Sequence, residues 1–240
     1  MPQNFQKKVL KNGITVLHEF RDLPIVSVSI TNKFGAAYEE SKIKGIAHVI
    51  EHSLFTGTKT RSNEDISREI EKRGGVLNAF TTHEVTSYWF KLPSEYVFSG
   101  LNILTDMLLN PTFEEEKFEK EKRVILEEIK MYHDNPKTAI FEQIEKNLFE
   151  PPFGELVIGS KETVSYLERD FVADYFQKTY APGNYIVAIV GKANFKKICD
   201  YLEIKLLCYR NVCNIANESI IELCGYPQNY SLFFFSSVCL

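Results

Sequence analysis

Residues 45–57, GIAHVIEHSLFTG, place two histidines and a glutamate in the order H-x-x-E-H. These residues are His48, Glu51 and His52. In a helix, residues three and four apart lie on one face, so all three side chains would point the same way. Two neutral imidazoles at this spacing can hold one Zn²⁺, and a carboxylate beside them can accept a proton from water that the metal polarises. The spacing therefore indicates metal-assisted hydrolysis.

The other positions of this segment are apolar on almost every side, which predicts a buried helix. An unpaired polar group in such a helix costs about 1 to 3 kcal/mol, and an unpaired charge costs more. A bound metal would satisfy both histidines and the glutamate. The alternative is a surface helix whose polar side chains face water, and so short a motif does not by itself exclude it.

A zinc site that hydrolyses its substrate needs a third protein ligand and keeps one position for water. Residues 113–131 predict a long helix whose apolar part contains Glu128, 76 residues after His52. Glu121 lies two turns earlier on nearly the same face. Most glutamates in such a run belong to a solvated face, so the spacing from the histidines is what singles out Glu128.

An H-x-x-E-H motif followed at this distance by glutamate within V-I-L-E-E resembles the pitrilysin or insulinase family of metallopeptidases, peptidase family M16. This family includes the mitochondrial processing peptidase. The segments LNAFTTHEVTSYWF (residues 77–90) and YAPGNYIVAIVG (residues 180–191) are also similar to it. The resemblance extends from about residue 7 to about residue 200, and implies the N-terminal, zinc-binding half of such proteins.

The resemblance also implies the roles of the candidate catalytic residues. Glu51 would be the general base, and Glu121 a carboxylate that steadies the site from behind its ligands. One Zn²⁺ per chain would be the cofactor, and its implied ligands are His48, His52 and Glu128.

For the substrate, the resemblance implies that the strand containing Asn78 and Ala79 binds extended peptide through its backbone. Without the resemblance, the favoured interpretation of Asn78 is an ordinary residue of a turn or an edge strand. His83 lies between Thr82 and Glu84, so we expect it at a loop tip and not among the metal ligands.

The remaining pattern predicts an α+β domain, a mainly antiparallel sheet backed by helices. The resemblance implies the metallohydrolase fold of processing peptidases, to which the fold of S-ribosylhomocysteine lyase is related. Asn12-Gly13 predicts a hairpin turn, with His18 on the surface of its second strand. Further strands are expected at residues 25–30, 76–80, 85–92 and 184–191, and further helices at residues 66–73, 93–110, 138–149 and 171–180.

With 240 residues and 44% hydrophobic content, the chain can form one substantial core. The net charge of −4 argues against a nucleic-acid partner. No apolar run reaches about 18 residues and no signal peptide is evident, so we expect no membrane partner and a cytoplasmic location.

We expect a peptidase domain at residues 1–202 and an atypical Cys-rich tail at residues 203–240. All five cysteines fall in the last 42 residues, which suggests truncation, a frameshift or altered splicing. Family members continue into a second half that supplies an Arg and a Tyr to the substrate. The resemblance therefore implies a partner, either that half or a homologous subunit.

The expected function is a zinc metalloendopeptidase acting on extended peptides. One alternative is a zinc-binding but proteolytically inactive subunit of a larger complex, although such a subunit has no need of Glu51. A second is S-ribosylhomocysteine lyase, which shares the helix motif but completes its site with a cysteine, and no cysteine precedes Cys199. Substrate preference and oligomeric state stay open.

Overall fold

The computed structural model describes residues 4–206 of the chain. The strands are β1 (Phe5–Val9), β2 (Thr15–Glu19), β3 (Ile25–Asn32), β4 (Val76–Thr81), β5 (Thr86–Pro93) and β6 (Tyr185–Gly191). The helices are α1 (Ile46–Leu54), α2 (Asn63–Glu71), α3 (Val97–Leu109), α4 (Glu115–Asp134), α5 (Pro136–Leu148), α6 (Lys161–Tyr166), α7 (Arg169–Thr179) and α8 (Phe195–Lys205).

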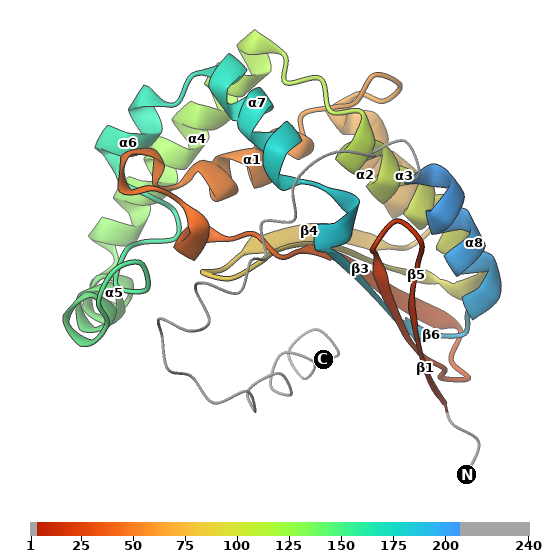
Figure 1. Cartoon of the computed structure of the whole chain (residues 1–240). Helices are drawn as coiled ribbons and strands as arrows, with labels where there is room; N and C mark the ends of the chain where they lie inside the picture. The colour runs from red at the N-terminus through yellow and green to blue at the C-terminus, as the bar shows by residue number, and fades with distance from the viewer. Residues whose placement is uncertain (1–3, 207–240) are drawn as a thin grey trace.

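The six strands form one sheet in the order β1-β2-β6-β3-β5-β4. All neighbours are antiparallel except β2 and β6, which are parallel. The helices gather on one side of this sheet, with α5 at the end of that layer, next to α4 and beyond the strands (Figure 1). The predicted α+β class, with a mainly antiparallel sheet backed by helices, is therefore confirmed.

Alternation along the strands decides which sheet face is covered. In β3, Val26, Val28 and Ile30 are fully buried, whereas Ser27 and Ser29 on the opposite face are partly exposed. Successive side chains of a strand point to opposite faces, so the apolar set faces the helices. The register continues this set onto β5 and β6, through residues such as Phe90 and Ile189. The core thus lies between the sheet and α1, α3 and α7.

The first hairpin forms as predicted, with β1 antiparallel to β2 and Gly13 at φ 88° in its turn. The prediction for His18 was wrong, because its side chain is only 2% exposed. His18 lies on the helix-facing side of β2, where its Nε2 pairs with the carbonyl oxygen of Gly191 at 3.1 Å. Its ring stacks on Phe195 of α8.

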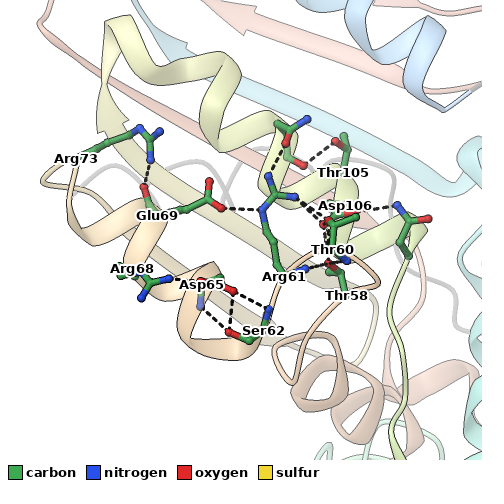
Figure 2. Close-up of polar contacts among 12 residues, drawn as sticks. Thr58, Thr60, Arg61, Ser62, Asp65, Arg68, Glu69, Arg73, Thr105 and Asp106 are labelled. Atoms are coloured by element: carbon green, nitrogen blue, oxygen red, sulfur yellow. Dashed lines mark hydrogen bonds and ion pairs between the residues drawn. The ribbon is translucent and has the colours of Figure 1, made fainter.

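Helix α1 is the buried helix that the sequence predicts. Its apolar residues are almost fully inaccessible, and it contacts α4, α7, β4 and β5. The segment that follows α1 is fastened to α3 by a polar cluster (Figure 2). There, Arg61 donates to Asp106 Oδ2 at 2.7 Å and to Glu69 Oε1 at 3.1 Å, while Thr58 donates to the same Asp106 oxygen at 2.6 Å.

This cluster buries its charges with their partners in place. Asp106 is 8% exposed, and it also accepts from Thr60 at 2.9 Å and from Asn110 at 2.8 Å. Burial raises the pKa of Asp106, but the hydrogen bonds from Thr58, Asn110 and Arg61 outweigh it and hold the pKa below its ordinary value. The start of α2 is also fixed, since Ser62 and Asp65 form a capping box.

Helix α8 ends at Lys205, so it includes the first residues of the tail predicted at residues 203–240. The part of this tail from residue 207 on lies outside the described residues. The predicted domain boundary therefore stays a prediction. Among residues 4–206, no helix combines the length and apolarity needed to cross a bilayer.

Candidate metal centre

Two helices bring the candidate ligands together. Helix α1 supplies His48 and His52, and the neighbouring α4 supplies Glu128. One ligand atom from each of these side chains lies within 4.8 Å of the others. Nε2 of His48 lies 3.9 Å from Glu128 Oε2, and Nε2 of His52 lies 3.7 Å from the same oxygen. The structure thus brings all three predicted ligands to one point.

The predicted supporting carboxylate, Glu121, lies behind His52. Its Oε2 is 3.3 Å from His52 Nδ1, on the far side of the ring from Nε2. A carboxylate at Nδ1 holds the proton there and leaves Nε2 as a free electron-pair donor. Glu128 is held in turn, because the Tyr132 hydroxyl donates to its Oε1 at 3.1 Å.

His48 is held in its neutral form by its surroundings. Burial, and after it the neighbouring His52, lower the pKa of His48 to about 3. A neutral imidazole is the form that can bind a metal ion. Nδ1 of His48 is buried and has no hydrogen-bond partner among residues 4–206. This ring therefore differs from that of His52, which has Glu121 at its Nδ1.

Glu51 lies beside the three ligands and contacts the sheet. Its Oε2 accepts a short hydrogen bond from the Thr81 hydroxyl of β4. Burial raises the pKa of Glu51 above its ordinary value, against the opposing effects of that hydrogen bond and of His52. For His52, burial lowers the pKa, but the Glu121 hydrogen bond and the nearby carboxylates outweigh it and raise the pKa.

The donor set fits a divalent cation. Its gaps of 3.7 and 3.9 Å are too long for hydrogen bonds. A tetrahedral ion with bonds of about 2.0 to 2.2 Å would hold its ligand atoms roughly 3.3 to 3.6 Å apart, which is close to these gaps. Three carboxylates, Glu51, Glu121 and Glu128, gather around two imidazoles, so a cation would also balance their charge.

The predicted substrate-binding residues lie on β4, an edge strand of the sheet. Ala79 shares the helix-facing side of β4 with Thr81, whereas Asn78 is exposed on the other side. Oδ1 of Asn78 accepts from the N–H of Ala79 at 2.8 Å. The structure therefore places this strand against the candidate site but does not bring the Asn78 side chain into it.

His83 does not join the metal cluster. Its Nε2 pairs with the carbonyl oxygen of Glu155 at 3.1 Å, and its ring packs against Phe153. This position agrees with the expectation that His83 lies outside the set of metal ligands.

Sequence reasoning missed two residues that touch the site. Tyr132 lies four residues after Glu128 on α4, so helical spacing could have identified it as a partner. Thr81 lies within the segment that resembles the family, but its contact with Glu51 joins residues 30 apart across two elements. No local pattern predicts such a contact.

Comparison with known proteins agrees with this geometry. The model of the insulinase family, peptidase family M16, matches residues 15–159. The chain belongs to this family of metallopeptidases. Within the family it is 36% identical to an uncharacterized zinc protease of Rickettsia felis, over 85% of this chain and 50% of that protein.

A second relative is the mitochondrial-processing peptidase subunit beta of Dictyostelium discoideum, 30% identical over 82% of this chain and 42% of that subunit. The chain thus spans half or less of the length of these two relatives. In a crystal structure, a protease from Helicobacter pylori has the same fold, with a TM-score of 0.81 over 88% of this chain and 52% of that one, at 23% identity.

Proposed function

We propose that this M16-family chain is the zinc-binding half of a metalloendopeptidase. His48, His52 and Glu128 would hold one Zn²⁺, and the proposal rests chiefly on the convergence of these three side chains from α1 and α4. When bound, Zn²⁺ would act as a Lewis acid on the peptide carbonyl and would lower the pKa of a coordinated water.

Glu51 is the proposed general base. The Thr81 hydroxyl bonds to Oε2, which leaves the other carboxylate oxygen to take a proton from the attacking water. The same carboxyl group then returns the proton to the leaving amine, so one residue serves both proton transfers. Burial favours this exchange, because it raises the pKa of Glu51 toward the working pH.

The proposed substrate is an extended peptide. Strand β4 forms the edge of the sheet, and Thr81 at its end bonds to the proposed base. A peptide paired with this edge beside Asn78 and Ala79 would pass the metal ligands in an extended conformation. Pairing with β4 would position the backbone of the peptide regardless of the peptide's side chains.

A second homologous half is the proposed partner. The chain spans only 50% of the Rickettsia relative and 42% of the Dictyostelium one. Without groups from a second half, stabilisation of the oxyanion falls on the metal site alone, and losing one such donor costs about 10² to 10³ in rate. We therefore propose weak activity for the chain by itself.

The test is cleavage of a fluorescence-quenched, unstructured peptide by the purified chain. We expect slow cleavage that stops on chelation, returns with zinc, and is absent in Glu51→Gln although that variant still binds zinc. Glu64→Gln, an exposed glutamate of α2, is the matched control. Zinc binding without any cleavage would instead point to the need for the second half or to the second candidate, an inactive structural subunit. Cleavage regained on adding a homologous second half would support the first of these.

A further inference from the structure

The helix that supplies both histidines cannot cap its own first turn. Gly45 is the N-cap residue of α1 and has φ 94°, a left-handed conformation that favours glycine. A Cβ at Gly45 would lie 2.6 Å from the carbonyl oxygen of Ile158, so no larger residue fits. Glycine carries no side-chain acceptor, yet the first N–H groups of a helix have no partner within it. An acceptor must therefore come from elsewhere in the chain.

Glu39 supplies that acceptor. Its Oε2 accepts from the N–H of Gly45 at 2.9 Å, and its Oε1 accepts from the N–H of Ala47 at 2.7 Å. Glu39 is only 6% exposed, and a carboxylate at this end of a helix also interacts favourably with the helix dipole. The second bond ends at the residue directly before His48.

The groups around Glu39 make its carboxylate a costly cap. Lys44, whose charge acts on Glu39, bonds the carbonyl oxygen of Ala36 at 2.8 Å and pairs with Glu155 at 2.9 Å. Burial raises the pKa of Glu39 to about 7, although both N–H bonds and Lys44 act in the opposite direction. Ordinary helices are capped by Ser, Thr, Asp or Asn without burying a charge in this way.

The two histidines of α1 are oriented by different means. His52 has Glu121 at its Nδ1, whereas Nδ1 of His48 has no hydrogen-bond partner among the described residues. The direction of the His48 ring therefore follows from the backbone of the first turn of α1 and from packing around it.

We propose that Glu39 is a positioning residue of the metal centre. By holding the N–H groups of Gly45 and Ala47, it fixes the first turn of α1 and so directs His48 toward His52 and Glu128. This role rests on the proposed zinc site. Glu39 thus orients His48 by bonding to the backbone of α1, whereas Glu121 orients His52 by bonding directly to its ring.

The first test is amide hydrogen exchange in the zinc-free chain. Glu39→Gln keeps the size of the side chain, but its amide has one acceptor oxygen, and its NH₂ group faces the other N–H. We expect exchange at Gly45 and Ala47 to become at least about tenfold faster, because part of the cap is lost. The control is Glu40→Gln, at an exposed neighbour, which should leave both rates unchanged. Unchanged rates in Glu39→Gln would overturn the proposal.

The second test measures metal binding by the folded variants. We expect Glu39→Gln to raise the Kd for Zn²⁺ about tenfold and to alter the absorption bands of bound Co²⁺, and Glu40→Gln to do neither. A purely structural role would lower the unfolding temperature without changing the Co²⁺ spectrum. If Glu39→Gln does not fold, Glu39→Asp, which keeps the charge but is one methylene shorter, should show the same two effects.

The outcomes separate the two proposals. A wild-type chain that binds no zinc would overturn the proposed function, and the role of Glu39 with it. Wild-type zinc binding with an unchanged Kd and Co²⁺ spectrum in the folded Glu39 variants would overturn the role of Glu39 alone.

Discussion

His52 Nδ1 lies 3.3 Å from Glu121 Oε2, while the opposite ring nitrogen of His52 faces Glu128 at 3.7 Å. His52 thus lies between two carboxylates. Glu121 fixes its tautomer, and Glu128 would bind the same metal ion. The first carboxylate has no ligand atom in the cluster but decides which nitrogen is available to the metal.

We therefore expect Glu121→Gln to weaken zinc binding by about 10- to 100-fold, because a neutral amide holds the Nδ1 proton less firmly. Competition with a chelator of known affinity measures the change. Glu116→Gln, at an exposed position on the same helix, is the control and should bind like wild type. Equal affinities for all three proteins would show that Glu121 does not support the site.

Thr81 is expected to act on the base and not on the metal. Thr81→Val keeps the shape of the side chain but removes the hydroxyl that bonds to Glu51. We expect zinc content to stay constant while cleavage slows about tenfold, and Thr81→Ser to restore most of the rate, because it restores the hydroxyl. A loss of zinc from Thr81→Val would mean that this residue supports the metal ligands instead.

The polar cluster behind α1 is predicted to be a stability element. In Asp106→Asn, the guanidinium of Arg61 loses the buried carboxylate that it bonds at 2.7 Å. Breaking a buried charged pair on one side costs about 3 kcal/mol, which would lower the unfolding temperature by roughly 6 to 12 °C. Asp174→Asn, at an exposed aspartate of α7, should change it by less than about 1 °C. If the unfolding temperature of Asp106→Asn fell as little as that of the control, this role would be contradicted.

The buried carboxyl of Glu39 makes stability depend on pH in a definite direction. Its pKa rises from 4.5 to about 7 in the folded chain, with burial and Glu155 raising it and Lys44 lowering it. The folded state thus holds the proton more tightly than the unfolded chain, and this contribution is full below pH 4.5 and is lost as pH rises through 7.

Between pH 5 and 8, the unfolding free energy of wild type should therefore fall by roughly 3 kcal/mol relative to Glu39→Gln. Urea unfolding of both zinc-free proteins at the two pH values measures this, and the comparison cancels groups such as Glu51 and His48 that titrate in both. A gap that is the same at both pH values would show that Glu39 does not titrate in this range.

The helical period of α1 is enough to place His48 and His52 on one face, because they are four residues apart. Glu128 is singled out instead by its distance of 76 residues from His52 and by the resemblance to the family. The strands could also be predicted from the sequence, since the alternation of apolar and polar residues in β3 matches the alternation of its burial. In both cases, the pattern and the packing have the same repeat.

Residues held by distant partners were not predictable in this way. His18 looks like a surface residue in the hairpin, but β6, more than 160 residues later, pairs beside its strand and buries it. Glu39 reads as one of several acidic residues before α1, and only the folded backbone shows that it caps the helix. Such roles depend on which segments meet in space, which no local period encodes.

The most direct measurement is the zinc content of the purified chain by elemental analysis, beside Glu128→Gln and its exposed neighbour Glu127→Gln. We expect one zinc ion per chain in wild type and in Glu127→Gln, and a large loss in Glu128→Gln, because Glu128 faces both histidines whereas Glu127 pairs with Lys130. A wild-type chain without zinc, or a Glu128→Gln chain that keeps its full zinc content, would contradict the proposed metal centre.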